Sequence, residues 1–357
     1  MNYIGIDYHK RYSVVCIVNE NDQILAEERI EHAFPERFAA LFAEHAPCAL
    51  AFEATMNWSW LYEVVERIPG VERIVMANPL YVRLIAAAQI KTDKIDARKL
   101  ARLLRANLLP ASHIPDRATR LRKEVLRQRT FWVRERTKVR NRIHRLLGRQ
   151  HDLAMPQVSD LFGRKGIAAL KKVVLESPED LLLRQLLETH SFLESQIAEL
   201  NKKIALEGKN DPATELLETI PGLGPILGNT IATEIDGIER FHGASEQLCA
   251  YAGTIPSTSS SGDKTYHGRL VQGCNKWLRW ALVEASWVAI GCDPYFGGLY
   301  RQHRARGKKA NTAIMIVARR MCQIVFRVLH EKRPFEVRTW RMISSGCSQL
   351  GRTERPA

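Results

Sequence analysis

The stretch GIDYHKRYSVVC, residues 5–16, decides the fold because it predicts two β-strands joined by a short polar turn. The apolar run around Asp7 predicts a buried strand, and the run that begins at Tyr12 predicts a second one. Burying a carboxylate costs several kcal/mol unless the group is paired, protonated or bound to a metal. Asp7 is therefore the first candidate for a functional residue.

Further patterns extend this pair of strands along the chain. QILAEERI at 23–30 predicts a third strand, which completes an antiparallel meander. CALAFEAT at 48–55 predicts a fourth strand, and a helix at 58–66, a fifth strand at 72–79 and an amphipathic helix at 91–107 follow. A meander followed by alternating helix and strand is an α/β order. It is also the order of the ribonuclease H-like fold.

Three more acids are expected to join Asp7. Glu53 closes the fourth predicted strand, so the two carboxylates meet at one sheet edge if the first and fourth strands are neighbours. Asp93 and Asp96 fall in the first turn of a helix, on one face with Cβ atoms roughly 5–6 Å apart. Taken alone, Asp93 and Asp96 could be first-turn acids that interact favourably with the helix dipole, and Glu53 could be a surface residue. Together the four acids predict a site for Mg²⁺, which prefers oxygen ligands.

The second part of the chain is dominated by one basic segment. Residues 116–149 carry 13 Lys and Arg against three acids, with an apolar stripe at seven-residue spacing, which predicts a long basic helix. A solvated surface helix would normally mix charges of both signs. We expect a polyanion to contact this helix through five candidate side chains, namely Arg127, Arg134, Lys138, Arg142 and Arg145.

A second long helix is predicted after Pro178. Its apolar positions fit a coiled-coil seam, either folded back on the basic helix or shared with another copy of the chain. The seam residues are Leu186, His190, Leu193, Ile197, Leu200 and Ile204. The polar run LEGKNDP at 206–212 ends this region. We therefore expect domains at 1–112, 113–212 and 213–335, and a flexible tail at 336–357.

The third domain is mostly helical in pattern and carries two motifs. LETIPGLGPILGNTIATEI at 217–235 has the form of a helix-hairpin-helix, in which Gly222 and Gly224 would let the turn approach a phosphate. An ordinary turn between two helices would show the same sequence pattern. A polar loop is predicted at 256–268, where hydroxyl groups precede the cations Lys264, Arg269, Lys276 and Arg279. On its chemistry alone, that loop is more typical of a flexible linker.

The overall composition narrows the class of protein. Lys and Arg number 53 against 39 acids, a formal net charge of +14, which favours nucleic acid as the partner. The seven cysteines are scattered without a zinc or redox spacing, which is typical of reduced thiols in a cytoplasmic protein. Because apolar runs all fall short of the roughly 20 residues that span a bilayer, no membrane association is expected.

Four segments together carry a family resemblance. GIDYHKRYSVVC, FEATMNWSWLYEVV and KTDKIDARKLARLL resemble the RuvC-like DEDD domain of insertion-sequence transposases of the one-ten family. These are relatives of Piv-type DNA invertases and include bridge-RNA-guided recombinases. The run SSSGDKTYHGRL with GCNKWLRWAL is similar to the serine-containing loop of the same family.

The resemblance implies a specific function. Asp7, Glu53, Asp93 and Asp96 would hold Mg²⁺, or Mn²⁺, and Ser260 would be the nucleophile that forms a phosphoserine link to DNA, with Ser261 as the alternative. It further implies a homo-oligomer, dimer or tetramer, a structured non-coding RNA from the element, and a cytoplasmic protein associated with the nucleoid when active. Two rivals stay open: a RuvC-like nuclease that uses activated water, and a non-catalytic nucleic-acid-binding protein.

Overall fold

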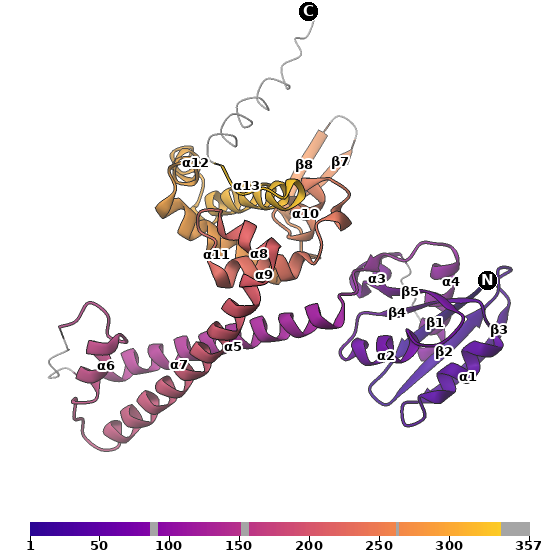
Figure 1. Ribbon diagram of the computed structural model, residues 1–357, viewed down its shortest axis with the longest axis horizontal. Coiled ribbons are helices and arrows are strands. Elements are labelled where there is room, and N and C mark those ends of the chain that lie inside the picture. The colour runs from indigo at the N-terminus through magenta and orange to yellow at the C-terminus, as the bar shows by residue number, and fades with distance from the viewer. Residues whose placement is uncertain (86–91, 151–156, 262–263, 337–357) are drawn as a thin grey trace, which may run out of the picture. The chain divides into compact units, whose positions relative to one another are not determined.

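A computed structural model describes residues 1–85, 92–150, 157–261 and 264–336 (Figure 1). The chain divides into two compact units, unit 1 at Met1–Pro115 and unit 2 at Asp116–Ala357. The tail predicted at 336–357 lies, apart from its first residue, outside the described residues. Among the described residues, none of the helices is both long and apolar enough to cross a membrane.

Unit 1 is a mixed sheet with helices on its two faces. The strands are β1 (Asn2–Tyr8), β2 (Tyr12–Val18), β3 (Ile24–Glu31), β4 (Cys48–Glu53), β5 (Val71–Ala77) and β6 (Ala111–Ser112). The helices are α1 (Glu36–Glu44), α2 (Trp58–Val65), α3 (Pro79–Ile85) and α4 (Asp93–Arg105). The strand order is β3-β2-β1-β4-β5-β6. The predicted meander, fourth strand, fifth strand and amphipathic helix are thus confirmed.

The register of the central strands follows from how each face is packed. β1 is antiparallel to β2 and parallel to β4, with Ile6 opposite Phe52. Ile6 and Phe52 lie in a core on one face with Phe38 of α1 and Leu61 of α2. On the other face, a Cβ atom at Gly5 would lie 2.0 Å from the Ala97 carbonyl oxygen of α4. Glycine therefore lets α4 lie directly on β1.

Unit 2 begins with an antiparallel pair of long helices. Helix α5 (Arg117–Leu147) is the predicted basic helix, and α7 (Glu179–Lys209) folds back against it, with the short α6 (Arg164–Leu170) between them in sequence. Arg129 of α5 donates to Asn201, and Arg140 donates to His190. His190, Leu193, Ile197 and Ile204 of the predicted seam are buried. The alternative in which the seam folds back on the basic helix is therefore the one found.

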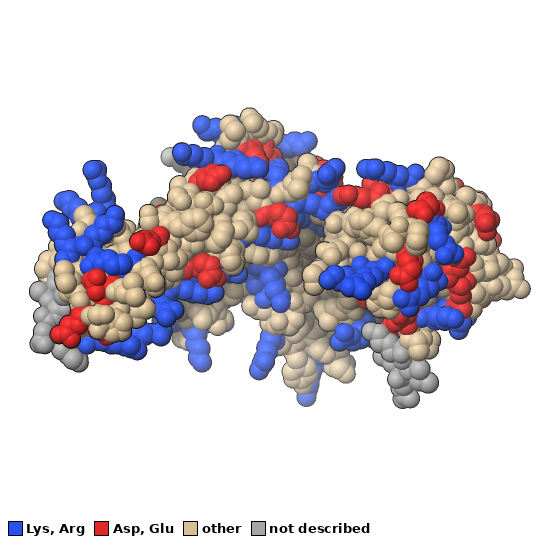
Figure 2. Space-filling view, turned by 90° about the horizontal axis from the view of Figure 1, so that it is seen from below, with Lys and Arg blue, Asp and Glu red and all other residues tan. Residues whose placement is uncertain are grey.

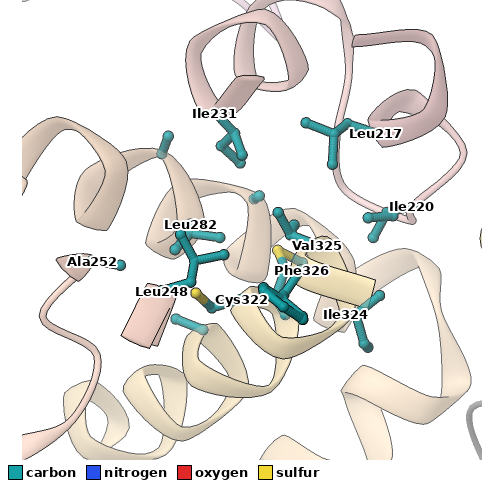
Figure 3. Packing of buried hydrophobic residues seen from close by; sticks show 14 of the residues in the cluster. Leu217, Ile220, Ile231, Leu248, Ala252, Leu282, Cys322, Ile324, Val325 and Phe326 are labelled. Atoms are coloured by element: carbon teal, nitrogen blue, oxygen red, sulfur yellow. The ribbon is translucent and has the colours of Figure 1, made fainter. Parts of the chain in front are cut away.

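The remainder of unit 2 is a helical domain around one large core (Figure 3). Leu217 and Ile231 reach this core from the first helices, and Leu282 and Val325 from the last ones. The helices are α8 (Pro212–Glu218), α9 (Pro225–Ile235), the short 3₁₀ helix η1 (Glu239–Phe241), α10 (Ser245–Tyr251), α11 (Lys276–Cys292), α12 (Pro294–Ala305) and α13 (Ala310–Glu331).

The prediction of a polar loop at 256–268 is wrong. Strands β7 (Pro256–Ser261) and β8 (Lys264–Leu270) pair there as an antiparallel hairpin. β-Branched and aromatic residues such as Thr258, Thr265 and Tyr266 suit strands, and pairing satisfies the backbone groups that a loop would leave to water. Gly262 and Asp263, between the strands, lie outside the described residues.

Candidate metal centre and serine hairpin

Two acids that are 86 residues apart in the sequence meet at the end of β1. Asp7, His9 and Asp93 each offer one ligand atom, and these atoms all lie within 4.8 Å of one another. The Nε2 atom of His9 is 3.1 Å from the Asp7 carboxylate and 3.3 Å from that of Asp93. Thr92 starts α4 at this point, because its hydroxyl accepts a hydrogen bond from the Ile95 N–H at 3.3 Å. The cap places Asp93 in the first helical turn.

The environment of Asp7 disfavours its charged form. The sequence suggested a carboxylate within a buried strand, but Asp7 is the next-to-last residue of β1 and its side chain is 23% exposed. Burial is the largest effect that raises its pKa, and the charges of Asp93 and Asp96 raise it further, while His9 lowers it. Like charges held this close are relieved by a divalent cation.

Glu53 and Asp96 flank this group. In the parallel pairing of β1 with β4, Ile6 is opposite Phe52, so the next residues along the two strands are Asp7 and Glu53. Asp96 lies three residues after Asp93 in α4, and its carboxylate is 3.3 Å from the Lys99 ammonium. Within the described residues, Asp7, His9 and Asp93 form the one group of three or more His, Cys, Asp or Glu side chains whose ligand atoms all lie within 4.8 Å of one another.

His9 is a site residue that the sequence interpretation missed. His9 is the first residue after β1, so the alternation of side chains along a strand did not mark it as a neighbour of Asp7. Tyr12 holds the arrangement together, because its hydroxyl donates to Asp93 at 3.0 Å and its ring lies 4.6 Å from the His9 ring.

These residues fit a divalent metal ion. Carboxylate oxygens suit Mg²⁺ and Mn²⁺, and a neutral imidazole nitrogen is a ligand of many protein-bound metal ions. Asp7 and Asp93 supply the oxygens, and the pKa of Asp7 is raised by burial first and then by the charges of Asp93 and Asp96, against the effect of His9. The side-chain chemistry is therefore that of a cation site.

Ser260 lies in unit 2, on the exposed hairpin. It is opposite Thr265 in the pairing of β7 with β8, and the two hydroxyls share a hydrogen bond of 3.0 Å. Ser261 is opposite Lys264, and both are exposed. Arg269 is exposed too, on β8. The hairpin thus presents hydroxyl groups and cations together to solvent.

Arg279 is placed differently from the other predicted cations. Its guanidinium lies at the base of the hairpin, where it donates to the carbonyl oxygens of Ala252 and Val271. Gly253, with φ of +64°, leaves the room that this side chain occupies, since a Cβ there would lie 2.1 Å from an Arg279 nitrogen. Arg279 thus fixes the chain around the hairpin.

A buried carboxylate joins the hairpin region to the basic helix. Glu234 of α9 is 3% exposed, and its carboxylate is 3.2 Å from Arg127 and 3.6 Å from Lys123, both of α5. Asn275 donates to the same carboxylate at 2.9 Å and caps α11 through the Trp277 and Leu278 N–H groups. A predicted nucleic-acid contact, Arg127, is therefore engaged within the protein.

The other candidate cations of α5 differ in their surroundings. Arg134 lies 5.4 Å from the Trp277 ring, and Lys138 pairs with Glu135 at 2.7 Å. Lys138, Arg142 and Arg145 also line a pocket of about 300 Å³ together with Arg149, whose contribution was not predicted. Basic side chains crowd around this end of the α5–α7 pair (Figure 2). Four cations around one hollow are suited to binding phosphate groups.

The two predicted hairpin glycines serve different purposes. Gly222 has φ of +90°, and a Cβ there would lie 2.3 Å from the Ala285 carbonyl oxygen of α11. Its close approach is thus to the protein's own helix. Gly224 precedes Pro225 at the start of α9, and a Cβ there would meet nothing within 4 Å. The backbone around Gly224 is the more open of the two.

Comparison with known proteins defines the class as DNA transposases. A DEDD-type transposase domain of the IS110 group matches residues 4–151, and the family described as Transposase IS116/IS110/IS902 family matches residues 214–301. The first match includes β1, β4 and α4 with the acidic cluster, and the second includes the serine hairpin. The chain belongs to the IS110/IS116 family of insertion-sequence transposases.

Curated relatives agree over most of the chain. It is 24% identical to the "Probable family 20 transposase" of Pseudomonas aeruginosa, over 82% of this chain and 85% of that protein. It is 25% identical to the transposase for insertion sequence element IS1328 of Yersinia enterocolitica, over 83% and 86%. It is 26% identical to the pilin gene-inverting protein of Moraxella bovis, over 94% and 98%. The family resemblance predicted from the sequence is confirmed.

Proposed function

We propose that this transposase cuts and rejoins DNA through a phosphoserine link, with Ser260 as the nucleophile and a divalent cation held by Asp7, Glu53, Asp93 and Asp96. The observation that carries the proposal is the meeting of Asp7 and Asp93 at the end of β1, with Glu53 next along β4. The strand order of unit 1 supports a ribonuclease H-like, RuvC-type domain. Mg²⁺ is the expected ion, and it would supply stabilisation of negative charge at the phosphodiester.

The proposed step is a transesterification, in which the phosphoryl group at one phosphodiester moves from a deoxyribose oxygen to the Ser260 oxygen. The Ser260 oxygen forms a bond to phosphorus, the bond from phosphorus to a deoxyribose oxygen breaks, and the hydroxyl proton leaves to a base. The leaving deoxyribose oxygen takes up one proton from solvent, so the freed strand ends in a hydroxyl group. Because the serine ester replaces the phosphodiester, it can be attacked later by another DNA hydroxyl, so rejoining needs no external energy source.

The two units bear complementary parts of this chemistry. The acids lie in unit 1 and the serine in unit 2. We propose that Ser260 of one subunit of a homo-oligomer acts with the acids of another subunit. Lys264 and Arg269, exposed on β8, would hold the phosphate beside Ser260.

The basic surface supports a nucleic-acid partner. The pocket formed by Lys138, Arg142, Arg145 and Arg149 offers charge without a groove-reading side-chain pattern. We propose that it contacts the backbone of DNA or of a structured non-coding RNA from the element. The turn between α8 and α9 would act as a helix-hairpin-helix, with the open backbone at Gly224 facing a phosphate.

A recombination assay tests the proposal. The protein is incubated with element RNA, a supercoiled plasmid that carries the element junction, a target plasmid and Mg²⁺. Products are scored as recombinants and as a protein–DNA adduct on a denaturing gel. The wild type should give both, whereas Ser260→Ala and Asp93→Asn should give neither. Ser261→Ala is the matched control and should retain the adduct.

The outcomes separate the rival functions. Strand cutting by Ser260→Ala without an adduct would indicate a nuclease that uses activated water. An adduct that persists in Ser260→Ala and is lost in Ser261→Ala would identify Ser261 as the nucleophile. Nucleic-acid binding by the wild type without cutting, unchanged by Asp7→Asn, would leave only a binding protein.

A further inference from the structure

We propose that His9 is a nitrogen ligand of the cation in unit 1, so that this transposase holds its metal with a mixed nitrogen and oxygen set. The inference deepens the proposed function and rests on it, since it presupposes that the acids bind a cation. It concerns a residue outside the predicted acidic tetrad.

The separations between the donor atoms carry the inference. Ligands that are adjacent in an octahedral shell with bonds of about 2.1 Å lie about 3 Å from each other. Nε2 of His9 is 3.1 Å from Asp7 Oδ2 and 3.3 Å from Asp93 Oδ2. A cation that bound both carboxylates would therefore meet the imidazole nitrogen as an adjacent ligand.

The His9 ring is held in this position by the turn between β1 and β2. The His9 N–H donates to the Tyr12 carbonyl oxygen at 3.0 Å, which closes the turn. The Tyr12 ring then packs against the imidazole at 4.6 Å, and the Arg29 guanidinium covers the Tyr12 ring at 3.6 Å. An imidazole held in place by its neighbours is suited to ligation, since less of its freedom is lost on binding.

Tyr12 also links the imidazole to the acids. Its hydroxyl donates to the same Asp93 oxygen that approaches Nε2. This is the arrangement of an outer-shell hydrogen bond, which orients a carboxylate ligand. Nε2 lies within hydrogen-bonding distance of Asp7, and a cation bound there would require the tautomer in which the ring proton is on Nδ1.

The other reading of His9 is an ion pair without a metal role. A protonated imidazole between two carboxylates would partly neutralise them and would occupy the position of the cation. The two readings differ in one measurable respect, which is whether a bound cation has a nitrogen in its first shell.

Mn²⁺ is the probe for this test, because it is paramagnetic and suits the same carboxylate oxygens as Mg²⁺. The full-length protein is loaded with one equivalent of Mn²⁺, and pulsed electron paramagnetic resonance measures the coupling to directly bound ¹⁴N. Asp7→Asn reports whether the ion is in this site. His9→Gln removes the nitrogen. His45→Gln is the matched control, because His45 precedes the start of β4, at the end of that strand opposite to Glu53.

We expect directly bound nitrogen in the wild type and in His45→Gln, and none in His9→Gln. The Mn²⁺ dissociation constant should rise at least about tenfold in His9→Gln, because even outer-shell partners of metal ligands change affinity by 10–100-fold. Mn²⁺ that is bound in an Asp7-dependent way without nitrogen would overturn the inference and leave the metal site intact. Mn²⁺ binding that does not depend on Asp7 would overturn the inference and the proposed function together.

Discussion

At Gly5, one hydrogen atom in place of a methyl group lets the helix that carries two acids lie on the sheet. A Cβ at this position would be 2.0 Å from the Ala97 carbonyl oxygen and 2.4 Å from the Ala101 nitrogen, both backbone atoms of α4. Helix α4 would have to move off β1 and take Asp93 and Asp96 with it. The same residue therefore decides packing and the geometry of the acidic cluster.

We predict that Gly5→Ala destabilises the protein by about 3 kcal/mol or more, since overpacking against backbone atoms has little room to relax. It should also weaken Mn²⁺ binding. Thermal unfolding and a metal titration measure the two effects. Gly224→Ala is the matched control, because a Cβ there meets nothing within 4 Å at an ordinary φ of −98°. Equal stability of the two variants would contradict the packing explanation.

The Asp7 carboxylate is expected to lower the stability of the metal-free protein, although it serves as a ligand when the cation is bound. Burial first, and then the charges of Asp93 and Asp96, raise its pKa, so the native state holds a proton more readily than the unfolded chain does. At neutral pH the ionised carboxylate therefore opposes folding, and this cost disappears as the pH falls below the ordinary value of 3.8.

The prediction is that Asp7→Asn melts at a higher temperature than the wild type in EDTA at pH 7. Added Mn²⁺ should raise the melting temperature of the wild type and leave that of the variant nearly unchanged. Differential scanning calorimetry with and without the metal measures both. A variant that melts lower in EDTA would show that the carboxylate stabilises the fold.

The sequence could predict the acids and not the histidine for a physical reason. A carboxylate in an apolar strand is costly enough to single out Asp7, and its strand neighbour Glu53 follows from the strand order. His9 follows the end of β1 in a polar turn, where a histidine has no such cost. Only the geometry of the turn, with Tyr12 packed on the ring, shows that His9 faces the acids.

At the scale of the elements, the basic helix α5 shows what a charge count leaves out. The acids that pair with it are far away in the sequence: Glu194 contacts Arg136 and Arg140, and Glu234 contacts Arg127. The predicted helix is correct because its apolar spacing is local. Which cations remain for a polyanion depends on long-range packing, and the sequence pattern could not show it.

The α5–α7 pair contains a group that should make it sensitive to pH. His190 is buried, and it accepts a hydrogen bond from Arg140. Burial and then the Arg140 charge lower its pKa below 6.5, with a smaller contribution from Arg136, against an opposing effect of Glu194. The unfolded chain therefore binds this proton at a higher pH than the native protein does.

It follows that the stability of the pair should fall as the pH decreases from about 6.5, by at most about 1.4 kcal/mol per pH unit for one group. His190→Gln should remove this dependence, whatever it does to the stability at pH 8. Hydrogen exchange of the α7 amides between pH 5 and 8 measures it, after correction for the intrinsic rate. The same slope in both proteins would assign the dependence to other groups.

The basic pocket at the end of this pair should bind phosphate groups. Arg145→Ala with Arg149→Ala should weaken nucleic-acid binding and lower the slope of log affinity against log salt by roughly 1–2, since each phosphate contact contributes about 0.9. Lys202→Ala with Lys203→Ala, two exposed cations on α7 outside the pocket, is the charge-matched control. Fluorescence anisotropy at several salt concentrations measures the slopes. Identical slopes for the two double variants would leave the pocket without a special role.

At the scale of the whole molecule, the residues of the proposed reaction are divided between two compact units. Unit 1 holds the acids around one end of a sheet, and unit 2 holds Ser260 on an exposed hairpin. Each unit has its own core, so neither needs the other to bury its apolar side chains. If Ser260 is the nucleophile, as proposed, it would need a cation or a base nearby, because a serine hydroxyl is a weak nucleophile at neutral pH.

This division makes the subunit origin of the site measurable. If Ser260 of one subunit meets the acids of another, then a mixture of Asp93→Asn and Ser260→Ala should recombine DNA although neither does so alone. The adduct should form only on the Asp93→Asn chain, which keeps the serine, and a size tag on one chain identifies it on a denaturing gel. Wild type mixed with the Asp93→Asn, Ser260→Ala double variant controls for exchange of subunits. Two folded single variants that exchange subunits and still give no adduct would show that each chain builds its site alone.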